Sequence, residues 1–247
     1  AVTDLRRCFR QTHKPGPASY FMGSLCIGTG CFYRLELTQA ERVQYIQELG
    51  ADGFEVTLGT HEELADIDTD RIAEQARDAE YVSVHAPIYR EYGTGEDDIA
   101  ALEELEAFRR AVGAQCVVFH PDLIPSAAFV LEQVDGAIEN MQRKKGFDRH
   151  DFAASLPPDA SIVLDICHAM TWGFEEIEHL FASYGDRIAH IHASAVGQEE
   201  HEFLKDHPDF FAKVKPYIGG HRIVLENRLD NLAQIDAEYR FVRDRLD

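Results

Sequence analysis

Short apolar runs rich in β-branched residues recur along the chain, and most are followed by a segment with helical periodicity. Seven of these runs end in a side chain that can bind a metal ion: Glu55, His85, His120, Glu139, Asp165, His192 and Glu226. Successive members lie 19 to 35 residues apart, which is about what one strand, one helix and two loops require. The pattern predicts repeated βα units with a functional side chain at the C-terminal end of each strand.

The same alternation assigns the individual elements. Strands are expected at residues 20–27, 52–58, 81–86, 115–119, 137–141, 161–166, 187–193 and 222–225. Helices are expected at residues 38–49, 69–79, 96–112, 126–134, 148–156, 174–184, 208–217 and 231–246. Gly50, Gly113 and Gly185 mark the ends of three helices. Eight alternating units without a linker predict an α/β fold, a single (β/α)8 TIM barrel over residues 1–247.

The composition agrees with one large hydrophobic core and narrows the classes of molecule that the protein could bind. Hydrophobic residues make up 45% of the 247 residues, and the formal net charge is −20. Such a charge argues against a surface that binds duplex DNA or anionic lipid and favours a small-molecule substrate. The excess of arginine over lysine, beside abundant acid, is also expected of a protein adapted to high salt, in which the charge would exclude nucleic acid less firmly. No apolar run is long enough to span a membrane, so we expect a cytoplasmic protein, for which a homo-oligomeric state stays open.

Four of the strand ends carry a candidate metal site: Glu139, Asp165, His192 and Glu226. A carboxylate that ends a buried strand needs a cation or a hydrogen-bond donor. Arg143 or Arg228 could provide an ordinary ion pair. The alternative is a divalent metal, since three oxygens and one nitrogen suit Mn²⁺, Zn²⁺ or Co²⁺. His168 follows Asp165 by three residues, so both side chains can reach the same pocket.

Histidines at other strand ends extend this candidate site. His85 and His120 could be metal ligands or core histidines bonded to a backbone carbonyl. The strand expected at 187–193 contains both His190 and His192. We expect only one of the two to face the barrel interior, and we choose His192 because it lies nearer the C-terminal end.

Four further residues have two interpretations each. Glu199 and His201 lie in an acidic loop, where they are either solvated or, together with His168, hold another metal ion. Glu55 either contacts substrate or forms a structural ion pair. Trp172 either walls a substrate pocket or packs beneath its rim. Our candidates for substrate binding are His168, Glu55 and Trp172.

Taken together, these motifs resemble those of the xylose-isomerase-like TIM-barrel superfamily. The resemblance covers the chain from about residue 20 to its end and is carried by motifs in family order: His85-Ala86-Pro87, Phe119-His120-Pro121, Ile138-Glu139-Asn140, Leu164 to His168, His190-Ile191-His192, Glu199 with His201, and Leu225-Glu226. That superfamily includes sugar and sugar-phosphate isomerases and epimerases, together with apurinic endonucleases of the endonuclease IV type.

The two branches imply different metal centres. The isomerase and epimerase branch implies one ion on Glu139, Asp165, His192 and Glu226, with the two glutamates as an acid/base pair. The endonuclease branch implies three zinc ions in overlapping sites. Their ligand sets would be His85, His120 and Glu139; Glu139, Asp165, His192 and Glu226; and His168, Glu199 and His201.

Two departures count against the nuclease branch. Glu199 stands where the nuclease pattern has Asp, and the loops after the first two strands lack the nuclease's Gly-rich and basic character. One departure counts against the isomerase branch, which often places an Arg soon after the strand-seven His, whereas residues 193–197 contain none. We therefore expect a divalent-metal-dependent isomerase or epimerase of a small sugar or sugar phosphate, using one to three ions of Zn, Mn or Co. The alternatives are a multinuclear zinc phosphoesterase and a non-catalytic binding barrel. The basic run Arg143, Lys144 and Lys145 either binds a substrate phosphate or is a solvated loop.

Overall fold

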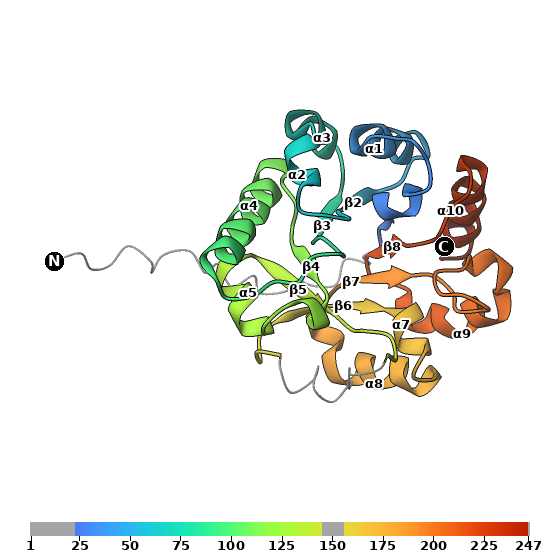
Figure 1. Ribbon diagram of the computed structural model, residues 1–247. Helices are drawn as coiled ribbons and strands as arrows, with labels where there is room; N and C mark the ends of the chain where they lie inside the picture. Colours follow the sequence, from blue (N-terminus) through green and yellow to red (C-terminus); the bar gives the residue numbers. More distant parts are fainter. Residues whose placement is uncertain (1–22, 145–155, 247) are drawn as a thin grey trace, which may run out of the picture.

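Eight parallel strands close into a barrel in the computed structural model of the chain, with helices around its outside (Figure 1). The structure describes residues 23–144 and 156–246. The strands follow one another around the barrel in sequence order, and β1 pairs with β8 to close it. The predicted TIM-barrel fold is confirmed.

The strands are short and almost entirely buried. They are β1 Leu25–Gly28, β2 Gly53–Thr57, β3 Tyr81–His85, β4 Val117–Phe119, β5 Gly136–Glu139, β6 Ser161–Asp165, β7 Ile188–Ala193 and β8 Ile223–Leu225. Each lies within a few residues of its predicted range. The part of the first predicted strand before residue 23 lies outside the described residues.

The helices pack their apolar stripes onto the outer face of the strands. They are α1 Gln39–Glu48, α2 Glu63–Asp66, α3 Thr69–Ala76, α4 Glu96–Val112, α5 Ala127–Gln133, α7 Ile166–Met170, α8 Phe174–Tyr184, α9 Pro208–Ile218 and α10 Leu232–Leu246. Short 3₁₀ turns are η1 Thr29–Phe32, η2 Pro121–Leu123, η3 Gly185–Arg187 and η4 Leu204–Asp206. The helix predicted at 148–156 lies almost wholly outside the described residues.

Local sequence signals explain several helix ends. Thr38 and Glu41 form a reciprocal capping box at the start of α1. Gly113 ends α4 in the left-handed conformation, with φ of 71°. The short helix α7 was not predicted. It begins directly after β6 because the Asp165 side chain accepts a hydrogen bond from the His168 backbone N–H at 2.6 Å.

Alternate residues of each strand point into the barrel, where they stack in layers. On β3 the inward-pointing residues include Ser83 and His85, and Ser83 contacts Glu55. On β7 both His190 and His192 point inward, because both imidazoles contact Glu55 inside the barrel. The expectation that only one of these two histidines faces the interior was therefore wrong. Residues two apart on a strand share a face, so both rings occupy the barrel.

No helix within the described residues combines the length and the apolar character that crossing a membrane demands.

Candidate metal centre

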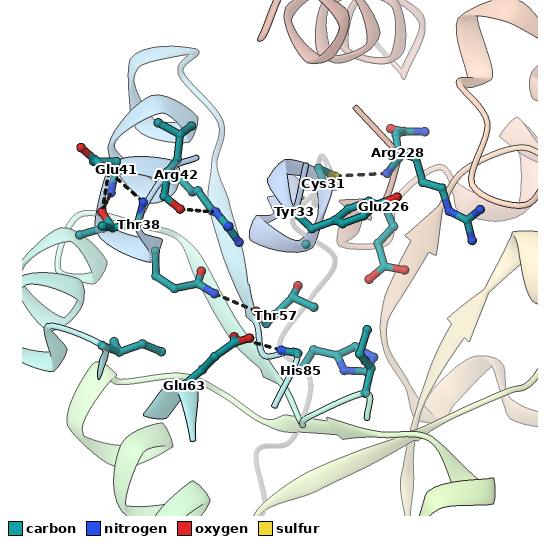
Figure 2. Close-up of a pocket in the computed structure, with 18 of the residues that line it drawn as sticks. Cys31, Tyr33, Thr38, Glu41, Arg42, Thr57, Glu63, His85, Glu226 and Arg228 are labelled. Atoms are coloured by element: carbon teal, nitrogen blue, oxygen red, sulfur yellow. Dashed lines mark hydrogen bonds between the residues drawn. The ribbon is translucent and has the colours of Figure 1, made fainter. Parts of the chain in front are cut away.

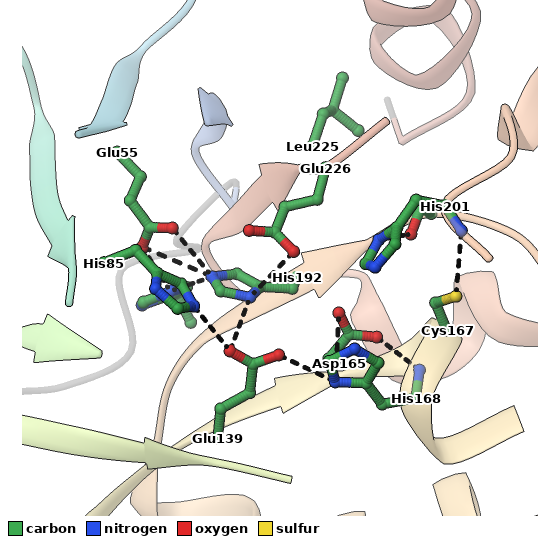
Figure 3. Close-up of polar contacts among 12 residues, drawn as sticks. Glu55, His85, Glu139, Asp165, Cys167, His168, His192, His201, Leu225 and Glu226 are labelled. Atoms are coloured by element: carbon green, nitrogen blue, oxygen red, sulfur yellow. Dashed lines mark hydrogen bonds and ion pairs between the residues drawn. The ribbon is translucent and has the colours of Figure 1, made fainter. Parts of the chain in front are cut away.

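Four side chains from four consecutive strand ends meet at the C-terminal mouth of the barrel. Glu139 ends β5, Asp165 ends β6, His192 lies near the end of β7, and Glu226 follows β8. Their ligand atoms all lie within 4.8 Å of one another. Figure 3 shows the Glu139 and Glu226 carboxylates pointing at the His192 ring from different sides. His192 Nδ1 lies 3.4 Å from Glu139 Oε2 and 3.3 Å from Glu226 Oε2.

This cluster has the donor set that a divalent cation needs. Asp165 Oδ2 and His192 Nδ1 are buried and have no hydrogen-bond partner among the described residues. An unpaired polar atom in a barrel interior is costly, and three carboxylates around one imidazole require positive charge. Three oxygens and one nitrogen suit Mn²⁺, Zn²⁺ or Co²⁺. The residues therefore fit the ion that the sequence predicted.

A second set shares Glu139 with the first. The Nε2 atoms of His85 and His120 lie 3.2 and 3.4 Å from Glu139 Oε2, and these three residues form a separate group that could hold an ion. The Nδ1 atom of His85 lies 2.8 Å from the carbonyl oxygen of Ala86. With Nδ1–H donating there, the Nε2 lone pair faces Glu139, which is the orientation a metal ligand requires.

Burial and mutual charge set the electrostatics of the centre. Burial raises the pKa of Glu226 to about 7, and His192 opposes that rise. Burial also works against ionised Glu139, but the surrounding imidazoles hold its pKa well below the ordinary value. For His192 burial lowers the pKa, and the carboxylates of Glu226, Glu55 and Glu139 outweigh it and hold the pKa well above normal. The two glutamates thus sit in different environments in one site.

The third predicted ligand set does not assemble among the described residues. His168 lies at the site, with Nδ1 3.0 Å from Glu139 Oε1, and its ring centroid is 5.5 Å from that of His201. Glu199, however, is 70% exposed and lies 3.7 Å from the Arg228 guanidinium. The structure therefore does not bring His168, Glu199 and His201 together, and their role as a ligand set stays a prediction. The longer Glu side chain extends to a surface cation rather than into the cavity.

The other predicted contacts fall outside the cavity. Glu55 is fully buried beneath the centre and is paired with His190 and His192, which favours its structural interpretation. Trp172 donates its indole N–H to the Met141 carbonyl at 2.9 Å, which favours packing beneath the rim.

The two described residues of the basic run, Arg143 and Lys144, contact side chains outside the cavity. The Arg143 guanidinium lies 5.8 Å from the centre of the Trp172 ring, and Lys144 pairs with Asp122. Lys145 lies outside the described residues. These contacts favour the solvated-loop interpretation over phosphate binding.

A cavity of about 1030 Å³ opens above the centre. His85, His120, Glu139, His168 and Glu226 form part of its lining. Figure 2 shows that Tyr33, Arg42 and Arg228 also border it, so the cavity wall mixes aromatic and basic groups with acidic ones. A cavity of this size accommodates a small-molecule substrate against the ligand cluster.

A layer of polar contacts beneath the candidate metal centre was not predicted from the sequence. Ser83 donates to Glu55 Oε2 at 2.8 Å, and the Tyr81 hydroxyl lies 2.8 Å from His190 Nδ1. The signal was present, because the His-x-His spacing of β7 and the Tyr-x-Ser-x-His spacing of β3 place these side chains on one face.

Comparison with solved structures supports the fold assignment. A D-tagatose 3-epimerase-like protein matches with a TM-score of 0.66 and 16% identity, over 90% of this chain and 96% of that one. Endonuclease IV from Thermus thermophilus matches with a TM-score of 0.64 and 16% identity, over 90% and 98%. The 3-keto-D-glucoside 4-epimerase from E. coli matches with a TM-score of 0.62 and 16% identity, over 90% and 99%.

A scan of protein-family models and a search of curated proteins give no match. The structural likenesses confirm, at the level of the fold, the resemblance to the xylose-isomerase-like TIM barrels. Epimerases and a nuclease share that fold, so the choice between them depends on this chain's own residues.

Proposed function

We propose that this chain is a divalent-metal-dependent isomerase or epimerase of a small sugar or sugar phosphate. The observation that carries the proposal is the convergence of Glu139 and Glu226 on His192 Nδ1 at the floor of a large cavity. Two carboxylates from β5 and the end of β8 can approach one carbon from different sides. That arrangement suits removal of a proton on one side and its return on the other.

Each carboxylate has a defined task in this reaction. One of them accepts the proton from the carbon next to the substrate carbonyl, and the other delivers a proton to the opposite face of that carbon or to the neighbouring carbon. A bound divalent cation would supply Lewis-acid stabilisation of the negative oxygen that develops. Asp165 and His192 would hold that cation and do not exchange protons with the substrate.

A direct test follows proton exchange rather than a named product. The protein is purified, loaded with Mn²⁺, Zn²⁺ or Co²⁺, and incubated in D₂O with a panel of ketoses, aldoses and their phosphates. NMR is expected to show deuterium entering the carbon next to the carbonyl of at least one sugar. The Glu139→Gln variant serves as the control. Absence of exchange across the panel with every metal contradicts the proposal.

Phosphoester hydrolysis is the second candidate, and one observation favours it. His85, His120 and Glu139 form a second ligand group that shares a carboxylate with the first. Two ions bridged by one carboxylate can activate water and stabilise a leaving oxygen. Cleavage of abasic-site DNA or of a small phosphodiester, without deuterium exchange into sugars, would select this function.

A further inference from the structure

We propose that Glu55, His190 and His192 form an additional cation site, buried in the barrel directly beneath the candidate metal centre. All three side chains are completely shielded from solvent. One ligand atom from each lies within 4.8 Å of the others. The site differs from the upper centre in using Glu55 and His190, and it does not depend on the proposed function.

The three ligand atoms form a nearly equilateral triangle. The two Nε2 atoms are 3.0 Å apart, and each lies 3.4 Å from Glu55 Oε2. Zinc bonds of about 2.0–2.2 Å to nitrogen and oxygen place tetrahedral ligands roughly 3.3–3.5 Å apart. The triangle therefore has nearly the dimensions of one face of a zinc site.

One proton shared between the two Nε2 atoms forms a hydrogen bond at 3.0 Å. That bond does not compensate the negative charge of the Glu55 carboxylate, which is completely buried. A divalent cation at the centre of the triangle would compensate that charge, and all three atoms would then act as donors of electron pairs.

The surroundings supply the outer contacts that metal ligands require. The Tyr81 hydroxyl lies 2.8 Å from His190 Nδ1 and can fix that ring with Nε2 facing inward. Ser83 donates to Glu55 Oε2 at 2.8 Å. The second oxygen, Glu55 Oε1, is buried, lies 3.3 Å from His192 Nε2 and makes no hydrogen bond among the described residues. The carboxylate can therefore bind an ion through one oxygen or through both.

His192 connects the two centres. Its Nε2 faces the lower triangle, whereas its Nδ1 faces Glu139 and Glu226 in the upper centre (Figure 3). With both sites filled, one imidazole ring would bridge two cations, and its last ring proton would be released to solvent. Occupancy of the lower site is therefore coupled to the geometry of the upper one.

Zinc alone is a sufficient probe. Crystals of the full chain grown with Zn²⁺ are measured on both sides of the zinc absorption edge. An anomalous peak between Glu55, His190 and His192, in addition to peaks at the upper centre, is the expected result. A peak at the upper centre with none in the triangle overturns the proposal and leaves Glu55 and His190 as hydrogen-bonding supports.

The zinc content of variants is the second test of the proposal. His190→Gln is expected to bind one Zn²⁺ fewer per chain than the wild type, whereas the exposed His179→Gln control on α8 binds the wild-type number. Asp165→Asn is expected to weaken the upper centre and keep the lower ion. Equal zinc content in His190→Gln and wild type also overturns the proposal. If His190→Gln fails to fold, the wild-type anomalous map decides the matter. Zinc in the triangle without sugar turnover would support this site and count against the proposed function alone.

Discussion

At the residue scale, Glu139 and Glu226 differ from the other acidic groups because both line the cavity and both contact His192. Replacing either with Gln removes a ligand charge and a candidate proton carrier while keeping the side-chain volume. We expect each variant to lose activity by about 10²- to 10⁴-fold, the range typical of a lost general acid or base. Steady-state kinetics on the sugar identified by deuterium exchange measures the loss.

The matched control is Glu132→Gln, an exposed change on α5 that should leave turnover unchanged. Circular dichroism checks that all three variants remain folded. Near wild-type turnover in Glu139→Gln or Glu226→Gln removes that residue from the mechanism.

At the element scale, two glycines at helix ends provide a clean comparison. Gly113 adopts φ of 71° after α4, and a Cβ there meets no atom within 4 Å. Gly185 after α8 has φ of −46° and equally open surroundings. Only backbone conformation separates them, so Gly113→Ala is expected to lower the free energy of unfolding by about 1–2 kcal/mol. Gly185→Ala should be neutral or slightly stabilising. Urea denaturation measures both, and equal effects contradict the argument.

The contact between α10 and η4 is expected to depend on pH. Glu238 is fully buried and accepts backbone N–H groups of Leu204 and Lys205 at 2.6 and 3.0 Å. Burial raises its pKa from 4.5 to about 7, although both N–H donors oppose the shift. The folded state thus keeps a proton that the unfolded chain releases between these two pH values, and stability falls as pH rises through this window.

Glu238→Gln imitates the protonated form and removes this loss. The free energy of unfolding of wild type minus that of the variant is expected to fall by on the order of 1 kcal/mol per pH unit between about pH 5 and 7. Urea denaturation at several pH values measures this difference in the free energy of unfolding. The buried histidines are the same in both proteins, so their contribution largely cancels in the difference. A difference that is constant with pH contradicts the role assigned to Glu238.

At the scale of the whole molecule, the metal centre should contribute to stability. Carboxylates and imidazoles crowd the barrel mouth, and cation binding to the folded state alone stabilises it by about 2.7 kcal/mol at a free concentration 100 times Kd. We expect chelator-treated protein to unfold at a lower temperature than zinc-loaded protein. Glu226→Gln should show a smaller difference in calorimetry. Identical unfolding temperatures with and without zinc would count against a resident cation.

The overall charge bears on the choice of substrate. With a net charge of −20, the chain is expected not to bind duplex DNA at about 0.15 M salt, because specific binders make roughly six to ten phosphate contacts through Lys or Arg. Fluorescence anisotropy with plain and abasic-site duplexes tests this. Salt-dependent binding and cleavage of the abasic duplex would favour the nuclease function.

The repeat, the barrel and the strand ends that carry chemistry could all be predicted from the sequence. Those features depend on local periodicity, and in a parallel barrel the carboxyl ends of all strands meet at one mouth. The sequence therefore groups Glu139, Asp165, His192 and Glu226 at one site, although their role as metal ligands stays a prediction.

The contacts that each side chain makes across the barrel could not be predicted in this way. Glu199 extends to Arg228, and Glu55 pairs with His190 and His192. These contacts join strands and loops far apart in the sequence, so they depend on barrel closure and side-chain length, which no local pattern records. The short helix α7 likewise follows from the Asp165 cap, a hydrogen bond that competes with the extended strand once the chain has turned at the barrel mouth.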